Sequence, residues 1–287
     1  MFGILNIDKP KGLTSRDVVN GVQRLIRPHK AGHAGTLDPL ATGVLVVCLG
    51  KATRLIQYVQ QQRKRYSGEF QFGLTSDTED IEGEVRRVAE AHVPTAEELQ
   101  AAIPEFVGEI EQRPPVFSAL KVKGKRAYQL ARQGEAVELA SRRIMIHGLK
   151  LVSYSYPRFQ LDIECGSGTY VRSLGRDIAA AVSASAVMTS LRRVAVGIFQ
   201  LEKAIPFAEL TAEKIASELL PAAMAVSHLP TLTVSPSDCH ELSNGRRIRN
   251  PGLTVKSEVA AMSIEGSLVA ILEVVDAGHI QPKRVFL

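Results

Sequence analysis

The chain has 287 residues and a formal net charge of +5, with 45% hydrophobic and 23% charged residues. This composition is typical of a soluble globular protein and excludes collagen-like, low-complexity and largely disordered chains. No apolar run approaches the roughly 20 residues that span a bilayer, and the first residues lack a signal-peptide pattern, so we expect a cytosolic protein without a membrane partner. The three cysteines are scattered and form no CxxC pair, which predicts reduced thiols, no disulfide framework and no zinc site.

The charge is distributed in three blocks. Residues 1–66 carry 11 Lys and Arg against 3 Asp and Glu, and residues 112–150 carry 9 against 2. Residues 77–111, between them, carry 2 against 11. Basic blocks of this size favour a polyanionic partner, nucleic acid first, although a solvated charged surface has the same composition. We expect the acidic block to face solvent, away from such a partner, or to offset the basic surfaces.

Short strands and helices follow one another in the first part of the chain. In order, we expect a strand at 2–7, a helix from Thr14 or Ser15 to Pro28, a loop at 33–43, a buried strand at 44–49, a helix at 51–60, a strand at 65–72 and a short helix opened by Thr95. The helices are predicted from capping residues and from apolar side chains at helical spacing. In the first helix these apolar residues are Val18, Val19, Val22, Leu25 and Ile26. The strands are predicted from runs of continuous or alternating apolar residues.

The second part of the chain is richer in strands. In order, we expect a strand-like run at 137–159, a strand at 161–165, a helix at 169–181, a strand at 191–201, a linker at 221–230 and short β runs at 253–255 and 268–274. Strands and helices mix without strict alternation, which favours an α+β fold. The tail of about 57 residues from Thr231 predicts a small β domain, too small to be very stable alone.

Asp38 is the candidate catalytic residue that the pattern of loops and strands indicates. It stands in the Gly- and Pro-rich loop before the predicted buried strand, where a fixed and ionised carboxylate can act as a covalent nucleophile. Pro39 restricts Asp38 to extended backbone geometry, and Gly35 and Gly43 let a substrate approach closely. Taken alone, an aspartate in such a loop more often serves an Asx-turn or a helix cap.

Six sequence blocks resemble, in order, the motifs of the TruB-type tRNA pseudouridine synthases. HAGTLDPLATG at residues 33–43 is similar to the signature of that family, and IDKPKGLTS at 7–15 resembles its N-terminal motif. The remaining blocks are KRY at 64–66, RPPVFSALK at 113–121, GTYVRSL at 168–174, and LRR followed by VG within 191–197. One such block would be weak evidence for the family, whereas six blocks in the family's order are specific evidence.

The resemblance implies both a fold and a reaction. The fold would be that of the pseudouridine synthases, an α+β fold with a mixed, mainly antiparallel central sheet and flanking helices, followed by a small PUA-like β domain. The reaction would be the isomerisation of uridine to pseudouridine at position 55 in the T-loop of tRNA, through base flipping. Uracil leaves its N–C glycosidic bond and rejoins through carbon without redox change, so we expect no cofactor and no metal.

The resemblance also assigns catalytic residues. Asp38 would be the nucleophile, attacking the sugar or the base or assisting loss of the base as a glycal, and the sequence does not separate these routes. Arg172 would pair with Asp38 and favour its ionised form. Tyr66 would stack on the flipped uracil, and its hydroxyl would take part in proton transfer. The alternatives are a surface helix arginine for Arg172 and cross-strand packing for Tyr66.

Further residues are carried over as substrate contacts. His33 would contact RNA from which the base has been extruded, and Tyr170 and Leu191 would line the pocket together with Tyr66. The basic segment 112–150 resembles the family's insertion that closes over the T-loop. The side chains predicted to hold RNA phosphates are Lys121, Lys123, Lys125, Arg126, Arg142 and Arg143.

The same resemblance sets the expected domains and partners. We expect a catalytic domain at 1–229, including the insertion at about 112–150, and a PUA-like RNA-binding domain at 230–287, in which Arg246, Arg247 and Arg249 cluster. The partner would be the T-stem-loop of tRNA, bound by a monomer without an obligate protein partner.

Two other functions compete with this hypothesis. A non-catalytic tRNA-binding or tRNA-folding chaperone would need the basic blocks but not a carboxylate among cations. An aspartyl-phosphate hydrolase would use Asp38 as nucleophile, but such enzymes usually need a second nearby aspartate and magnesium, whereas Pro39 and Leu40 follow here.

Overall fold

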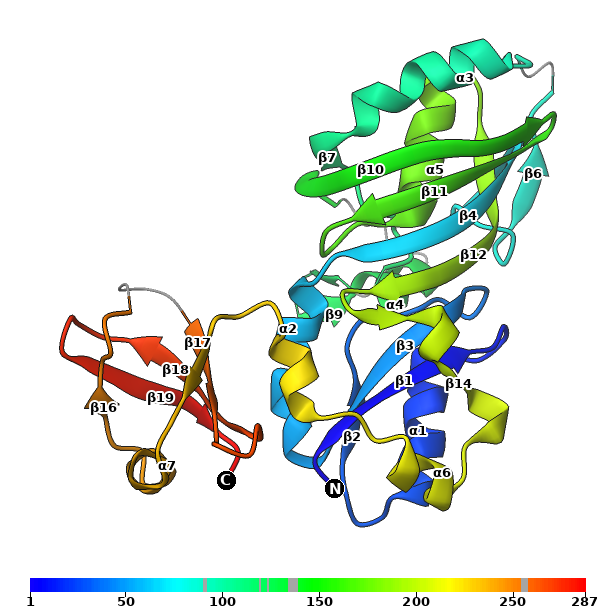
Figure 1. Ribbon diagram of the computed structural model, residues 1–287. Coiled ribbons are helices and arrows are strands. Elements are labelled where there is room, and N and C mark those ends of the chain that lie inside the picture. Colours follow the sequence, from blue (N-terminus) through cyan, green and yellow to red (C-terminus); the bar gives the residue numbers. More distant parts are fainter. Residues whose placement is uncertain (90–91, 119, 123, 134–138, 254–257) are drawn as a thin grey trace. The chain divides into compact units, whose positions relative to one another are not determined.

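The computed structural model describes residues 1–89, 92–118, 120–122, 124–133, 139–253 and 258–287, which form two compact units (Figure 1). The first unit consists of Met1–Leu37, Leu45–Gln62 and Ile198–Leu287. The second consists of Asp38–Val44 and Arg63–Gly197. Within the described residues, no helix combines the length and the apolar character needed to cross a membrane.

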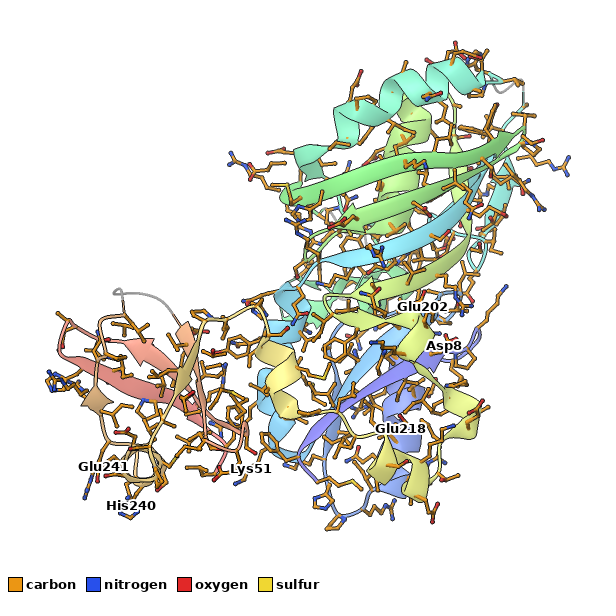
Figure 2. All side chains as sticks on the ribbon, viewed as in Figure 1. Asp8, Lys51, Glu202, Glu218, His240 and Glu241 are labelled. Carbon is orange, nitrogen blue, oxygen red and sulfur yellow. The ribbon has the colours of Figure 1, made fainter. Side chains whose placement is uncertain are left out.

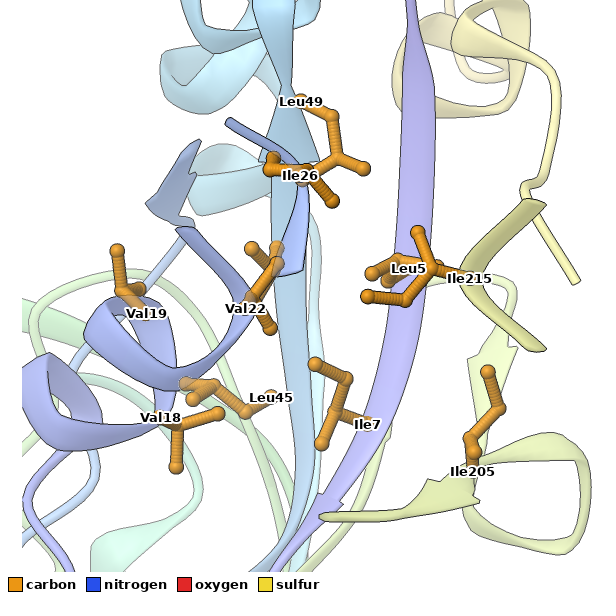
Figure 3. Close-up of a cluster of buried hydrophobic side chains, with 11 residues drawn as sticks. Leu5, Ile7, Val18, Val19, Val22, Ile26, Leu45, Leu49, Ile205 and Ile215 are labelled. Carbon is orange, nitrogen blue, oxygen red and sulfur yellow. The ribbon is translucent and has the colours of Figure 1, made fainter. Parts of the chain in front are cut away.

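The N-terminal part of the first unit packs one helix on a small sheet. The strand order is β14 (Ile205–Pro206), β1 (Gly3–Lys9) and β3 (Thr42–Leu49), with β2 (Ala31–His33) antiparallel to β3. Helix α1 (Ser15–Leu25) begins at the predicted cap, where Thr14 and Asp17 form a reciprocal capping box. Its buried face of Val18, Val19 and Val22 meets Leu5 and Ile7 of β1 (Figure 3). Leu25 does not belong to this face, because its side chain is exposed.

Short helices connect the parts of the first unit. They are η1 (Gly50–Leu55), α2 (Ile56–Gln61), η3 (Leu201–Lys203), η4 (Phe207–Glu209), α6 (Ala212–Ser217) and η5 (Ala222–Val226), and β13 (Phe199–Gln200) precedes η3. The helix expected at 51–60 therefore begins as a 3₁₀ helix, and the expected linker at 221–230 contains helical turns.

The tail of the chain forms the expected small β module. Its strand order is β15 (Thr231–Thr233), β17 (Glu258–Met262), β18 (Leu268–Val274), β19 (His279–Val285) and β16 (Ile248–Arg249). Helix α7 (Pro236–Ser243) carries His240 and Glu241 (Figure 2) and buries Leu242 in the core of this module. The β run expected at 253–255 falls mostly outside the described residues.

The second unit is built on a mainly antiparallel sheet. The order is β12 (Ala186–Val196), β4 (Lys64–Phe72), β11 (Arg158–Cys165), β10 (Arg142–Ser155) and β7 (Gly108–Gln112). All four pairings are antiparallel, and at the edge of this sheet Thr42 and Gly43 of β3 pair in parallel with Arg192 and Arg193 of β12. Helix α5 (Val171–Ala181) packs on this sheet against β12 and β4, and α3 (Ala96–Ala102) lies against α5 (Figure 1). The expected α+β fold with a mainly antiparallel sheet is confirmed.

Smaller elements complete the second unit. They are the hairpins β5 (Leu74–Ser76) with β6 (Val85–Arg87) and β8 (Lys121–Val122) with β9 (Lys125–Arg126), and the helices η2 (Ile103–Phe106) and α4 (Ala127–Arg132).

Several predicted strand limits were wrong. The expected run at 137–159 starts only at Arg142 as β10, and a turn at Tyr156 and Pro157 separates it from β11, which takes in the end of that run and the strand expected at 161–165. Residues 137 and 138 lie outside the described residues. The strand expected at 191–201 is β12, which begins at Ala186 because it pairs with Phe72 of β4.

Candidate active site

The loop that carries Asp38 is anchored on both sides. Leu37, the residue before it, donates its backbone N–H to the buried Ser15 hydroxyl at 2.8 Å, and that hydroxyl lies 3.0 Å from the Leu37 carbonyl. After it, the Leu40 N–H donates to Glu82 at 3.2 Å. Gly43 has φ +98°, and a Cβ built there would lie 2.3 Å from the carbonyl oxygen of Arg193. The loop is therefore fixed by hydrogen bonds and by a close backbone approach that only glycine permits.

The Arg172 guanidinium binds Asp38 and three other acceptors. Its Nε lies 3.0 Å from Asp38 Oδ2 and 3.7 Å from Asp80 Oδ2. Nη1 donates to the Thr78 carbonyl at 2.5 Å, and Nη2 donates to the Phe117 carbonyl at 3.2 Å. The Arg172 side chain is 7% exposed, whereas Asp38 is 36% exposed. A buried cation thus holds a carboxylate that remains open to solvent, and Arg172 is not a surface helix arginine.

Asp80 is a site residue that the sequence reasoning missed. Its carboxylate is 5% exposed and accepts hydrogen bonds from Thr78 Oγ1 at 2.6 Å and from the Glu82 N–H at 3.0 Å. The acidic block was expected to face solvent or to offset basic surfaces. Instead, Asp80 turns inward beside Arg172, because a buried guanidinium needs anionic or carbonyl partners from every side.

Glu79 extends this network along α5. Its carboxylate accepts hydrogen bonds from Ser173 Oγ at 2.6 Å and from Arg176, and its backbone has φ +64°. Burial raises the pKa of the Glu79 carboxyl above its ordinary value, against the opposing effect of these two donors. Arg176 also donates to the Arg113 carbonyl at 3.0 Å. Consecutive turns of α5 therefore fasten residues 78–80 and the 113–117 loop around Arg172.

Tyr66 lies on β4 between the neighbouring strands. It pairs with Ile163 of β11 and with Arg193 of β12. Burial raises the pKa of the Tyr66 hydroxyl, and the Arg193 guanidinium, which is hydrogen-bonded to it, acts in the opposite sense. Arg193 is itself buried and donates from Nε to the Val44 carbonyl at 2.7 Å. Tyr66 therefore stays neutral near pH 7, and its hydroxyl lies close enough to Asp38 for that carboxylate to influence its pKa.

The other predicted pocket residues occupy defined places. Leu191 lies on β12 opposite Gly68 of β4, and its side chain is buried. Tyr170 forms the N-cap of α5, two residues before Arg172. His33 lies on β2 of the first unit, opposite Val47 of β3, so it belongs to a different unit from the other predicted site residues.

The predicted phosphate contacts are only partly described. The backbones of Lys121, Lys125 and Arg126 lie in the β8–β9 hairpin, and Lys123 falls outside the described residues. Arg143 is exposed on β10 and lies 3.3 Å from Glu109. Arg142 instead places its guanidinium 4.7 Å from the centroid of the Tyr170 ring. Across the part of the chain that the structure describes, no group of three or more His, Cys, Asp or Glu side chains is arranged to hold a metal ion.

Comparisons with known proteins bear on this site. Residues 23–171 match the model of the TruB family pseudouridylate synthase N-terminal domain. The whole chain is 41% identical to the tRNA pseudouridine synthase B of Dehalococcoides mccartyi, covering 97% of that protein, and 40% identical to the protein of the same name from Xanthomonas campestris, covering 94% of it. The structure is also similar to a chain in the crystal structure of a Cbf5-Nop10-Gar1 complex, with a TM-score of 0.77 and 26% identity over the whole chain and 85% of that chain.

Proposed function

Since the chain belongs to the TruB family of pseudouridylate synthases, we propose that it isomerises uridine to pseudouridine in tRNA, at position 55 of the T-loop. The match with proteins named tRNA pseudouridine synthase B extends over the full length of this chain and nearly all of theirs, which supports the same substrate class. The observation that carries the proposal is the partly exposed Asp38 carboxylate held 3.0 Å from a buried arginine.

The reaction needs a carboxylate of this kind. The bond between N1 of uracil and C1′ of the ribose breaks, the ring turns, and C5 forms a new bond to C1′. The proton on C5 leaves and N1 gains one, so atoms and electrons balance within the substrate and one proton exchange. Asp38 acts as nucleophile on the sugar or the base, or assists loss of the base as a glycal. Arg172, whose Nε lies 3.0 Å from Asp38 Oδ2, fixes the direction in which the carboxylate approaches the substrate.

Tyr66 and the pocket residues complete the proposed chemistry. The Tyr66 ring stacks on the everted uracil, and its neutral hydroxyl hands over or receives the proton exchanged at C5. Tyr170 and Leu191 line the pocket, and His33 contacts the RNA from which the base was extruded. Extrusion costs a few kcal/mol, which these contacts offset.

We place RNA binding on the basic surfaces. Within the segment at about 112–150, the part between β7 and β10 closes over the T-stem-loop, since the two ends of the segment lie on those strands. The PUA-like module at 230–287 also binds the RNA, with Arg247 and Arg249 exposed on it. Arg246 lies 3.4 Å from Glu241 of α7. Residues 1–229, which include the segment at about 112–150, form the proposed catalytic domain. We propose that a monomer acts in the cytosol on tRNA, without an obligate protein partner.

Nucleotide-resolved pseudouridine mapping on an unmodified tRNA transcript tests this function. We expect one new pseudouridine at position 55 after incubation with the wild-type chain, and none in a transcript with cytidine at that position. Tight tRNA binding without any pseudouridine would favour the tRNA-folding chaperone instead. Pseudouridine at another position would keep the activity and overturn the assigned site.

A further inference from the structure

The guanidinium of Arg142 contacts the chain segment that leads into α5. Besides lying over the Tyr170 ring, it donates from Nη2 to the carbonyl of Gly168. Gly168 has φ +88°, and a Cβ built there would lie 3.5 Å from Arg142 Nη2, an ordinary van der Waals contact. The Nε atom of Arg142 is buried, and no hydrogen-bond partner for it exists among the described residues. This planar cation therefore packs between Gly168 and Tyr170.

Gln112 holds the backbone of the same tyrosine. It lies on β7 directly opposite Arg142 of β10 and is fully buried. Its Oε1 accepts the Tyr170 N–H at 2.9 Å, and its Nε2 donates to the Tyr170 carbonyl at 3.0 Å. Tyr170 is the N-cap of α5 but supplies no side-chain cap, and its carbonyl also accepts the Leu174 N–H. The β7–β10 pair thus fixes both the backbone and the ring of Tyr170.

We propose that Arg142 is a positioning residue for the isomerisation rather than an RNA-phosphate contact. It sets the orientation of the Tyr170 ring and, together with Gln112, the start of the helix that presents Arg172 to Asp38. The inference rests on the proposed function, which places Tyr170 in the uridine pocket. Arginine suits this role because its flat guanidinium stacks on an aromatic face while a peripheral N–H reaches a carbonyl, and a lysine ammonium cannot do both.

The test separates catalysis from RNA binding. The variants are Arg142→Lys, which keeps the charge, and Arg142→Ala. The matched control is Arg158→Ala on the neighbouring strand β11, an exposed arginine 4.0 Å from Glu69. For each protein we would measure the single-turnover rate at saturating enzyme, the Kd for the tRNA transcript, and the slope of log Kd against log salt concentration.

The expected result is a loss of rate without a loss of affinity. Both Arg142 variants should slow the single turnover by about tenfold or more, since a cation–π contact and one charge-assisted hydrogen bond are lost. Their Kd and salt slope should match the wild type, and Arg158→Ala should match it in all three measurements. A phosphate contact would instead weaken Kd, reduce the salt slope by about 0.7–0.9, spare the rate at saturation, and be rescued by lysine. That outcome, or unchanged values throughout, would overturn the proposal.

A second measurement covers the case in which Arg142→Ala unfolds. In a Tyr170→Leu background, Arg142→Lys should slow the reaction by a smaller factor than in the wild-type background, because the ring contact is absent and only the hydrogen bond to the Gly168 carbonyl remains to be lost. An effect as large as in the wild-type background would contradict the role. If the wild-type chain and Arg158→Ala both form no pseudouridine, the proposed function itself has failed; if both are active and the Arg142 variants match them, only this inference has.

Discussion

Replacing Arg172 with lysine tests the arrangement around Asp38 most sharply among the arginines of the site. The guanidinium uses all three of its nitrogens, reaching Asp38, Asp80 and the carbonyls of Thr78 and Phe117. A lysine ammonium keeps the charge, but its single nitrogen cannot reach these separated acceptors together. Arg172→Lys therefore removes directed contacts while leaving the net charge of the site unchanged.

The structure gives the expected size of the effect. A hydrogen bond to a charged group contributes about 1.5–3 kcal/mol, and each 1.4 kcal/mol of lost transition-state stabilisation slows a reaction about tenfold. Loss of the Asp38 contact alone should therefore lower the single-turnover rate by about 10- to 150-fold. A buried carbonyl left without its donor costs about 1–3 kcal/mol of stability, so the Tm of this 287-residue chain should fall by about 2–5 °C.

The assay is tritium release from tRNA labelled at C5 of uridine, with enzyme in excess. Far-UV circular dichroism melting shows whether the variant is folded at the assay temperature, and Arg158→Lys, an exposed arginine on β11, serves as the control. A folded Arg172→Lys protein that releases tritium at the wild-type rate would refute the reasoning.

Four further outcomes are expected. Tyr66→Phe keeps the ring and should lower the single-turnover rate by at least about 100-fold; unimpaired product formation would exclude a catalytic hydroxyl. Asp80→Asn should slow turnover by about tenfold or more while tRNA affinity stays unchanged, since it weakens the hold on Arg172; an unaltered rate would contradict that role. Gly43→Ala should lower the unfolding free energy by about 1–3 kcal/mol, because its Cβ would meet the Arg193 carbonyl at 2.3 Å; an unchanged denaturation midpoint would show that the approach is not tight. Burial lowers the pKa of Lys64 to about 8 from 10.5, so the unfolded chain binds more protons between these values and stability should rise across that range, by on the order of 3 kcal/mol in total; Lys64→Met should lack this rise, and an equal rise in both proteins would contradict the burial.

Local signals predicted the elements that local interactions define. The helices expected to begin at Thr14 or Ser15 and at Thr95 do begin there, and the structure forms a capping box at each threonine, because a cap depends on residues three positions apart. Strand β2 (Ala31–His33) was not predicted; it ends at the first residue of the loop expected at 33–43. Strand β12 begins earlier than expected. Both are fixed by a partner strand that is distant in sequence, so propensity alone does not mark their ends.

The candidate site was predictable only where a motif marks it. Asp38 and Arg172 were paired through the resemblance, and the structure brings them to 3.0 Å. Asp80 and Glu79 stand in a strongly acidic block, whose composition indicates solvated residues. Their burial depends on Arg172 and Arg176, more than 90 residues further along the chain. The Arg142 stack on Tyr170 was equally hidden, since nothing in a basic segment distinguishes an arginine that binds phosphate from one that packs on a ring.

The measurement that tests the central claim most directly compares the wild-type chain with Asp38→Asn on the same tRNA transcript. Asparagine keeps the size and much of the hydrogen bonding of the side chain but removes the carboxylate. We expect the variant to fold, to bind the transcript with the wild-type Kd, and to form no pseudouridine by mass-shift tagging even after prolonged incubation. Pseudouridine formed by purified Asp38→Asn at a rate comparable to that of the wild type would contradict the account.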